Sequence, residues 1–203
     1  MKILLTYVLF ILSGLSTMNA KSESLTKSAN ELPGTVMLEF YNPEDFSSVQ
    51  LIHDTVMGGR STGGIKPVSE PAGLRFFGNL SLANNGGFAS AEFKLAAALP
   101  SPIYRSIKLH IAADGRQYQL RLKTPFLAQG VAYVAEFNSA IDMQNYYFKP
   151  ADFSGRYRGR LVANLPALSL ADVSHISVML ADGQSGTFSI ILYSLSLSSA
   201  QTI

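Results

Sequence analysis

The segment from His53 to Gly64 holds the densest group of residues that could do chemistry: a histidine, an aspartate, hydroxyl side chains and four glycines. Around Ser61 it also matches the G-x-S-x-G string that places the nucleophile of α/β-hydrolases. That mechanism needs a helix directly after the serine, but two prolines follow within ten residues, and proline breaks a helix interior. We therefore interpret the segment as a glycine-bent loop and expect no serine nucleophile.

Asp54 has two interpretations. As a structural residue, its carboxylate would accept hydrogen bonds from the backbone N–H groups of Val56 or Met57 and so fix an Asx-turn. As a functional residue, it would bind a sugar hydroxyl, a cation or a basic side chain of a partner, because loops at the ends of a β-sandwich carry such contacts. The neighbouring His53 could take part in binding, but adjacent side chains of an extended chain point to opposite sides and rarely form a catalytic dyad.

The other candidate residues indicate no metal centre and no catalytic group. The three histidines, His53, His110 and His175, are isolated and lack the carboxylate spacing of zinc or iron sites. The chain has no cysteine, which excludes disulfides and thiolate ligands. No nucleophile, base and orienting group can be named together. The sequence therefore predicts a protein that is not an enzyme and that needs no cofactor and no metal.

A second polar block, Asn84-Asn85-Gly86-Gly87-Phe88, follows the first. Asparagine and glycine tolerate left-handed backbone conformations, so both blocks are predicted to form loops at sheet ends. Gly58 or Gly59 is expected to have a positive φ. The asparagines of the second block either make the turn or hydrogen-bond a ligand. The apolar residue beside each glycine pair, Met57 or Phe88, is expected to anchor its loop on the core.

The elements that must position these loops are predicted to be short β-strands. Apolar and polar residues alternate in segments that Gly, Pro, Asn, Asp and Ser clusters separate, and no amphipathic helix of three turns is evident. Strands are predicted at 35–40, 73–82, 88–95, 106–111, 117–123, 131–137, 145–148, 176–180 and 188–197. Many short strands without alternating helices favour an all-β fold, an antiparallel jelly-roll β-sandwich.

The clearest strand pair lies on either side of Asp114-Gly115, a dipeptide typical of hairpin turns. Residues 106–111 and 117–123 alternate strictly, which predicts an antiparallel hairpin with a plain turn. In that hairpin the apolar side chains face the core and the polar side chains form one surface. The apolar set is Ile107, Leu109, Ile111, Tyr118, Leu120 and Leu122, and the polar set is Lys108, His110, Gln119, Arg121 and Lys123.

Three motifs occur in order along the chain: Asp54-Thr55-Val56-Met57-Gly58-Gly59-x-Ser61, Leu82-x-Asn84-Asn85-Gly86-Gly87-Phe88-Ala89-Ser90 and Asp114-Gly115-Arg116-x-Tyr118. Together they resemble the signature of the complex I intermediate-associated protein family, over about Phe40 to Leu197. The resemblance implies a galactose-binding-like β-sandwich. The sequence departs from the family pattern in having no tryptophan and in placing His53 before the aspartate. The candidate binding residues within the motifs are Asp54, Met57, Gly58, Gly59, Ser61, Asn84, Asn85, Gly86, Gly87, Phe88, Asp114, Arg116 and Tyr118.

The N-terminal residues are typical of an export signal. A positive charge precedes an apolar run, Ile3 to Leu12, which is shorter than the roughly twenty residues that span a bilayer. Small residues follow up to Ala20, where cleavage is expected. We therefore predict a signal peptide at 1–20, a flexible leader at 21–34 and one domain at 35–199, in a periplasmic or secreted protein. Membrane contact is expected only if the N-terminal segment stays uncleaved.

Charge and resemblance narrow the function to binding. The formal net charge of +2 and the pI near 8.8 give no basic face, so nucleic acid is not an expected partner. The resemblance implies a non-catalytic binding or assembly-factor domain that acts by protein–protein interaction outside the cytoplasm. The alternative is an exported carbohydrate-binding module, for which nine tyrosines and twelve phenylalanines could stack on sugar rings. The expected partner is an unidentified protein or a glycan.

Overall fold

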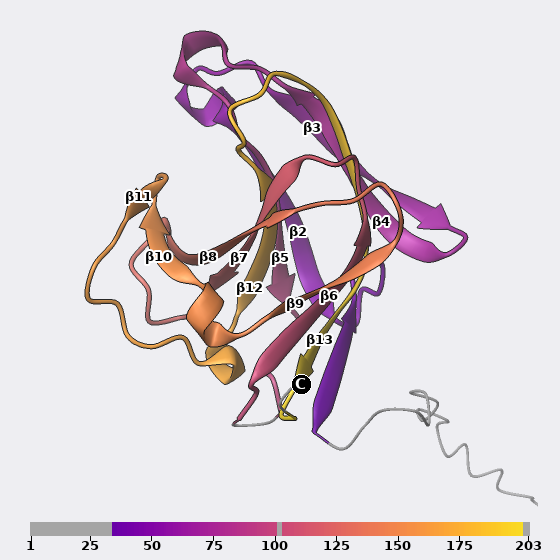
Figure 1. The fold of residues 1–203 in the computed structure, drawn as a ribbon, viewed down its shortest axis with the longest axis vertical. Coiled ribbons are helices and arrows are strands. Elements are labelled where there is room, and N and C mark those ends of the chain that lie inside the picture. Colours follow the sequence, from indigo (N-terminus) through magenta and orange to yellow (C-terminus); the bar gives the residue numbers. More distant parts are fainter. Residues whose placement is uncertain (1–33, 101–102, 201–203) are drawn as a thin grey trace, which may run out of the picture. The chain divides into compact units, whose positions relative to one another are not determined.

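The fold consists of two antiparallel β-sheets that pack face to face (Figure 1). The computed structural model describes residues 34–100 and 103–200, and the predicted signal peptide and nearly all of the predicted leader lie outside these residues. The described helical elements are short 3-10 turns: η1 (Asp54–Met57), η2 (Ala83–Asn85), η3 (Pro150–Asp152) and η4 (Leu170–Asp172). Within the same two ranges, no helix has the length and apolar character that crossing a membrane requires. The predicted all-β jelly-roll sandwich is confirmed.

The first sheet has six strands and is built around β13. Its strands are β1 (Thr35–Glu39), β3 (Thr62–Ser69), β4 (Ala72–Leu80), β6 (Ser106–Ala112), β9 (Gln144–Phe148) and β13 (Gly186–Ser198). The main path runs β3-β4-β13-β6-β9, and β1 pairs with the last part of β13. Because β13 is thirteen residues long, it has room for β4 and β1 one after the other along one of its edges.

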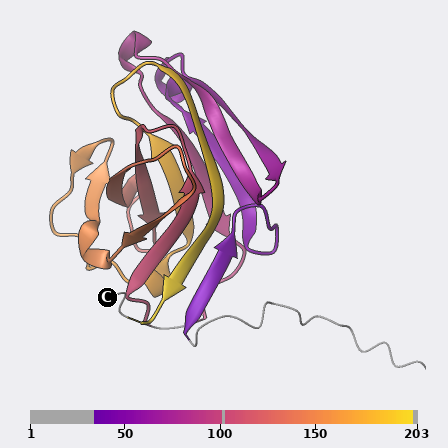
Figure 2. The ribbon, with the colours of Figure 1, turned by 45° about the vertical axis from the view of Figure 1, so that its right-hand side comes forward.

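The second sheet has seven strands in the order β11-β10-β8-β7-β12-β5-β2. They are β2 (Phe46–His53), β5 (Ala89–Leu95), β7 (Gln117–Lys123), β8 (Val131–Asn138), β10 (Ser154–Tyr157), β11 (Arg160–Leu161) and β12 (His175–Leu180). The rotated view in Figure 2 shows the short orange hairpin β10–β11 at one edge of this sheet. β7 and β12 are central strands, with partners on both sides.

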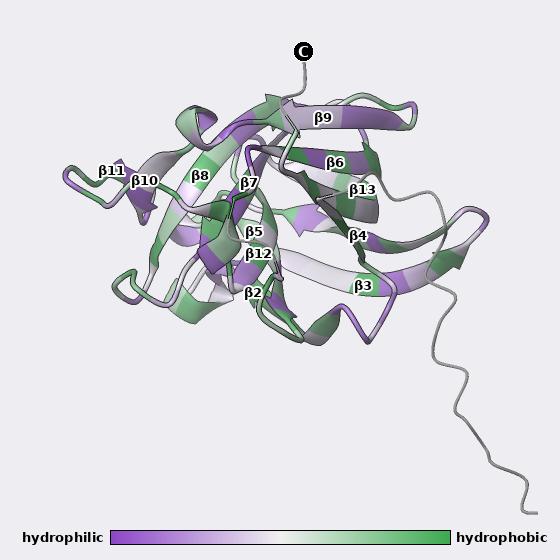
Figure 3. Ribbon diagram, turned by 90° about the horizontal axis from the view of Figure 1, so that it is seen from below, coloured by the Kyte–Doolittle hydropathy of each residue, from purple (hydrophilic) through white to green (hydrophobic). Residues whose placement is uncertain are grey.

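The core lies between the two sheets and is formed by alternate side chains of their strands. Phe76 and Ile190 of the first sheet and Phe93 and Leu120 of the second are fully buried. Hydrophobic and hydrophilic colours alternate along several strands in Figure 3, as expected when only one face of each sheet is apolar. Burying each such side chain contributes about 1.5–3 kcal/mol, so packing supplies the stability that a chain without cysteine cannot gain from disulfides.

The predicted hairpin around Asp114-Gly115 is wrong. β6 pairs with β13 and β9 in the first sheet, whereas β7 pairs with β8 and β12 in the second. The predicted core-facing residues, such as Leu109 and Leu120, are fully buried, but they face each other across the sandwich. Lys108 and Arg121 therefore lie on opposite outer faces of the molecule. Alternation predicts which side chains are buried, but it does not specify which strand is the partner.

Four strands, β2, β3, β10 and β11, were not predicted. β3 contains Gly63, Gly64 and Pro67, which disfavour strands, yet it lies at an edge of the first sheet, where proline is tolerated. β2 is an edge strand of the second sheet, and four consecutive residues of it are exposed, so its alternation is weak. β11 has only two residues. β10 lies between β8 and β11 but has only four residues, too few to show a period.

Candidate functional site

The first glycine loop (residues 54–61) and the second glycine loop (residues 81–88) are joined through one carboxylate. Asp54 begins η1 directly after β2 and is fully buried. Its Oδ1 accepts a hydrogen bond from the Ser61 N–H at 2.9 Å. Its Oδ2 accepts from the Ser61 hydroxyl at 2.5 Å and from the Gly87 N–H at 2.6 Å. Two of the three sequence motifs therefore meet at a single buried anion.

The glycines of the two loops meet two different needs. Gly58 and Gly87 have φ values of +86° and +127°, which side chains with a Cβ rarely adopt. Gly59 and Gly86 have ordinary φ values, but a Cβ on either would collide with the Asp54 carboxyl group. The predicted positive φ is confirmed at Gly58, whereas Gly59 is required because another part of the chain approaches it closely.

Hydrogen bonds keep the Asp54 carboxylate ionised. Burial raises the pKa of Asp54, but the hydrogen bonds from Ser61 and Gly87 lower it by more, so the pKa lies below its usual value. The predicted Asx-turn with Val56 or Met57 is wrong, because the carboxylate bonds partners 7 and 33 residues further along the chain. Asp54 has a structural role, as one interpretation predicted, but it acts across loops and not within its own turn.

Three apolar side chains of the glycine loops are exposed to solvent. Val56, Met57 and Leu82, which we call the loop apex, are 73%, 56% and 45% exposed. The Asn84 side chain donates from Nδ2 to the Gly58 carbonyl at 3.0 Å, which connects the two loops. The anchoring role predicted for Met57 is wrong, because η1 directs its side chain to solvent instead of to the core.

The second glycine loop holds two further predicted residues. Asn85 is exposed and has a left-handed conformation, with φ 57°, so it makes the turn. Phe88 is half-buried, and its carbonyl accepts the Asp54 N–H at 3.2 Å. The backbone of Phe88 therefore adds one more link between the two glycine loops.

The half-buried side chain of His53 points between the two sheets. It is the register partner of the buried Ala89, and a Cβ on Gly63 would lie 2.6 Å from its Nε2. Burial lowers the pKa of His53, although the charge of Asp54 acts to raise it. Nε2 is buried and has no hydrogen-bond partner among the described residues. The imidazole thus occupies the space that Gly63 leaves open, and it is a packed side chain at this end of the sandwich.

The third motif forms a separate network at the same end of the sandwich. Arg116 contacts both oxygens of Asp182, with Nε–Oδ2 at 2.9 Å and Nη2–Oδ1 at 2.7 Å. Asp114 accepts hydrogen bonds from the Arg116 N–H at 3.1 Å, the Tyr118 hydroxyl at 3.1 Å and the Ser189 N–H at 2.8 Å. Burial raises the pKa of Tyr118 far above its usual value. The third motif was expected to form a plain turn. It instead connects the two sheets, and it is hydrogen-bonded to the β12–β13 loop and to β13.

All three motifs lie where β2, β4, β6 and β12 end and β5 and β7 begin, but they form two separate polar networks. The carboxylates of Asp54 and Asp114, the Ser61 hydroxyl and the Arg116 guanidinium are bonded to partners within the protein. The exposed residues of the motifs include the loop apex, Asn84 and Asn85. The binding role of the motif residues stays a prediction.

A polar surface that the motifs do not include lies on the outer face of the second sheet. We call this surface the sheet face. It consists of the outward residues Ser90, Glu92 and Lys94 of β5, His175, Ser177 and Met179 of β12, Gln119, Arg121 and Lys123 of β7, Ala132, Val134 and Glu136 of β8, and Ser154 and Arg156 of β10. Their neighbours along each strand point into the core.

Hydrogen bonds and an ion pair link residues across the sheet face. Glu92 Oε2 accepts from the Lys123 ammonium at 2.5 Å and from the Ser177 hydroxyl at 3.0 Å. Gln119 Oε1 accepts from Arg121 Nη1 at 3.1 Å. Burial lowers the pKa of Arg121, while the charge of Glu92 raises it and the charge of a neighbouring arginine lowers it. Charged side chains are thus held in defined positions on central strands.

The small residues of the sheet face lie below the long ones. Ala132, Val134 and Ser177 are 0%, 3% and 1% exposed although they point away from the core. Ala132 is the register partner of Arg156, and Val134 is the register partner of Arg121. Long charged side chains commonly lie along apolar neighbours with their heads in solvent. The sheet face is therefore a polar surface with an apolar floor.

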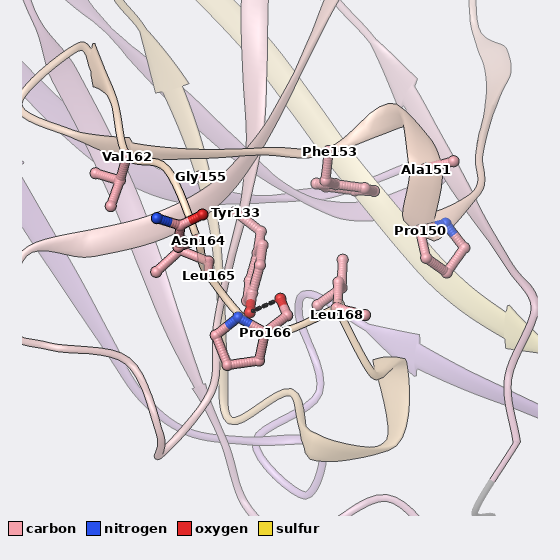
Figure 4. Close-up of a pocket in the computed structure, with 11 residues that line it drawn as sticks. Tyr133, Pro150, Ala151, Phe153, Gly155, Val162, Asn164, Leu165, Pro166 and Leu168 are labelled. Atoms are coloured by element: carbon pink, nitrogen blue, oxygen red, sulfur yellow. Dashed lines mark hydrogen bonds between the residues drawn. The ribbon is translucent and has the colours of Figure 1, made fainter.

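A pocket of about 520 Å³ lies beside β8 and β10, under the segment 162–168 (Figure 4). Most of the residues that line it have apolar side chains: Tyr133, Pro150, Ala151, Phe153, Gly155, Val162, Asn164, Leu165, Pro166, Ala167 and Leu168. The Tyr133 hydroxyl donates to the Pro166 carbonyl at 2.8 Å, the bond drawn in Figure 4. The lining residues include no carboxylate, histidine, lysine or arginine. In the part of the chain that the structure describes, no cluster of three His, Asp or Glu side chains could hold a metal ion.

The comparison with known families decides the classification. The model of the complex I intermediate-associated protein 30 family matches residues 38–192, which include all three motifs. The chain belongs to the complex I intermediate-associated protein 30 family. The family resemblance inferred from the motifs is therefore confirmed. No curated protein matches this family member.

Solved carbohydrate-binding modules share the fold of this family member. One is a family 11 carbohydrate-binding module from Clostridium thermocellum in complex with a β-1,3-1,4-mixed-linked tetrasaccharide, with 15% identity, TM-score 0.57 and coverage of 85% of this chain and 100% of the module. Another is the family 11 module of the cellulosomal cellulase Lic26A-Cel5E of Clostridium thermocellum, with 15% identity, TM-score 0.58 and coverage of 85% and 99%. At this identity the similarity shows a common fold and no common site.

The sequence of this family member contained part of the signal for the sheet face. Strict alternation in β7 marked Gln119, Arg121 and Lys123 as one polar surface. It could not show that Glu92 and Arg156 join them, because those residues lie on β5 and β10, which are distant in the chain. Only the strand order brings the five side chains onto one face.

Proposed function

We propose that this family member is a non-catalytic binding module, that its ligand is a glycan, and that the sheet face is its binding surface. One observation carries the proposal: the charged and amide side chains of the sheet face are linked to each other by hydrogen bonds and an ion pair. Glu92 bonds Lys123 and Ser177, and Gln119 bonds Arg121. A hydroxyl-rich ligand is recognised well by donors and acceptors that are already fixed before binding, because little side-chain entropy is lost.

The solved family 11 modules support the choice of a glycan. They share the sandwich over 85% of this chain, and one of them is described in complex with a mixed-linked tetrasaccharide. In the loops of the present protein, the Asp54 carboxylate is fully buried, and the Asp114 carboxylate accepts hydrogen bonds from donors within the protein. The polar groups of the sheet face, in contrast, lie on an outer surface of the molecule.

Hydrogen bonding and charge, not stacking, are the means of recognition in this proposal. The residues of the sheet face include no phenylalanine and no tyrosine. Several of the aromatic rings considered as stacking platforms are buried, as Phe76 and Phe93 are in the core. Exposed rings occur elsewhere, for example at Tyr147 on the outer face of the first sheet. The number of tyrosines and phenylalanines in the chain is therefore not evidence for how the proposed surface binds a glycan.

A titration of the full chain with a panel of polysaccharides tests this function. Affinity gel electrophoresis measures retardation of the parent, of Gln119→Ala and of Lys108→Gln, which changes the outer face of the other sheet. We expect Gln119→Ala to weaken binding and Lys108→Gln to leave it unchanged. Absence of binding to every polysaccharide, or equal losses in the two variants, would refute a glycan site on the sheet face.

Protein binding through the loop apex is a second candidate function. Val56, Met57 and Leu82 expose apolar side chains on loops that the Asp54 network holds in shape, and such patches are typical of docking sites. Membership of a family described as complex I intermediate-associated favours a protein partner. We expect Val56→Ser with Met57→Ser to abolish retention of a co-purifying partner without lowering the melting temperature. Retention of the same partner by the double variant would exclude the loop apex.

A further inference from the structure

The sheet face concentrates positive charge. Its permanent cations are Lys94, Arg121, Lys123 and Arg156, and its carboxylates are Glu92 and Glu136. This excess of two positive charges equals the formal net charge of the whole chain, +2. His175 lies in the same surface and adds further positive charge when protonated. The other charged residues of the chain, 12 lysines and arginines and 12 aspartates and glutamates, have a formal sum of zero.

One row of the sheet face holds three basic residues. His175 on β12 is the direct register partner of Lys94 on β5 and of Lys123 on β7. Burial lowers the pKa of His175, and the charges of Lys123 and Lys94 lower it further, while Glu92 acts to raise it. A row of basic side chains favours the approach of an anion.

The cations of the sheet face are largely without acidic partners. Of the carboxylates in the described residues, none forms an ion pair with Lys94, Arg121 or Arg156. The contact that fixes the Arg121 guanidinium is to the neutral amide of Gln119 at 3.1 Å. A partly buried cation that lacks a counter-ion is costly, and a bound anion would offset that cost.

The cations also extend over a distance that a single small anion cannot cover. Lys94 lies on β5 and Arg156 on β10, and the strand order places four inter-strand spacings between them. At about 4.8 Å for each spacing, the two backbones are roughly 19 Å apart. A ligand that contacts both must be a chain with several charged units.

We propose that the ligand of the sheet face is an acidic polysaccharide, whose carboxylate or sulfate groups bind at Arg121, Arg156 and Lys94. This inference rests on the proposed glycan-binding function and names the ligand class. The planar guanidinium groups of the two arginines can each contact two oxygens of a carboxylate or sulfate, and Lys94 supplies a point charge.

The test compares acidic and neutral polysaccharides on the full chain by isothermal titration calorimetry. Polygalacturonate supplies carboxylates, dextran sulfate supplies sulfates, and dextran and mixed-linked β-glucan are neutral. A DNA duplex serves as a polyanion that is not a glycan. The variants are Arg121→Gln, Arg156→Gln and the charge-preserving Arg121→Lys, with Lys108→Gln as the matched control on the other sheet. Thermal melts of each variant verify that it is folded.

We expect at least one acidic polysaccharide to bind at least about tenfold more tightly than the neutral ones, with an affinity that falls as salt increases. Arg121→Gln and Arg156→Gln should each weaken that binding about tenfold, Arg121→Lys less, and Lys108→Gln not at all. Preference for polygalacturonate or for dextran sulfate identifies the anionic group.

Three results would overturn the inference. Equal affinity for acidic and neutral polysaccharides through the sheet face would remove the acidic ligand but leave glycan binding in place. Equal affinity for the DNA duplex would reduce the sheet face to a general polyanion surface. Binding to no polysaccharide would remove both the acidic ligand and the proposed function.

Discussion

Replacing Asp54 tests whether one buried carboxylate holds the two glycine loops together. Asp54→Ala removes the acceptor of three hydrogen bonds, from the Ser61 N–H, the Ser61 hydroxyl and the Gly87 N–H. It also leaves a space beside Gly59 and Gly86, whose lack of a Cβ gives the carboxyl group room. Asp54→Asn keeps the volume but presents a donor NH₂ to at least one group that is itself a donor.

The magnitude follows from the number and kind of bonds. Hydrogen bonds to a charged group are worth about 1.5–3 kcal/mol each, and an unsatisfied buried N–H costs a comparable amount. Because the three bonds share one carboxylate, their energies do not simply add. We expect Asp54→Ala to lower the free energy of unfolding by about 3–5 kcal/mol and Asp54→Asn by about 2–3 kcal/mol. In a protein of this size, the first loss lowers the melting temperature by roughly 10 °C.

Urea unfolding and thermal melts of the parent and both variants measure these losses. The matched control is Asp172→Ala, which removes an exposed carboxylate and should change the free energy of unfolding by less than about 0.5 kcal/mol. If Asp54→Ala unfolds at the same urea concentration as this control, the carboxylate does not hold the loops together. If Asp54→Ala loses ligand binding at an unchanged melting temperature, Asp54 is a binding residue and the structural interpretation is refuted.

The same network predicts a pH dependence. The pKa of Asp54 is lower in the folded protein than its usual value near 3.9, which applies to the unfolded chain. Because the pKa is lower in the folded state, the ionised carboxylate stabilises the protein at any pH above the unfolded-state pKa. This stabilisation is lost as the pH falls through the folded-state pKa. The difference in free energy of unfolding between the parent and Asp54→Asn should therefore be constant from about pH 7 to about pH 5 and shrink below about pH 4. A difference that grows in acid would contradict this assignment.

Three further predictions concern the loops, the third motif and export. Gly58→Ala should lower the free energy of unfolding by about 1 kcal/mol, because Gly58 has open space around it but a positive φ. Gly59→Ala should lower the free energy of unfolding by more, because the added Cβ collides with a buried carboxyl group. Equal melting temperatures of the two variants would contradict this distinction. Arg116→Lys should lower the urea midpoint, because lysine cannot reproduce the two-oxygen contact with Asp182, and a midpoint equal to that of the parent would show that the contact adds nothing. We propose that the protein is exported and cleaved after Ala20; mass spectrometry of the native protein should find the processed chain, and an intact N-terminus in the cytoplasmic fraction would contradict export.

Local patterns determined the class of fold and the burial of many side chains. Period-two alternation is a property of a strand by itself, so it predicted that Leu109 and Leu120 face a core without knowledge of their partners. Glycine chemistry is also local, and it predicted the positive φ of Gly58. Three motifs in order indicated the family, because their spacing is read directly from the chain. These are the features that the amino-acid sequence decided by itself.

The tertiary structure decided the partners of those residues. The hydrogen-bond acceptor for Gly87 is Asp54, 33 residues earlier in the chain, and no local pattern marks that pair. β6 and β7 were expected to form a hairpin, but each gains two other strand partners, and the connection at Asp114 crosses between sheets. Arg121 and Arg156 belong to one cationic surface because strand order, which depends on pairing over the whole chain, places β7, β8 and β10 side by side. The sequence of each strand specifies which face its side chains occupy, whereas only the assembled sheets specify which other side chains they meet.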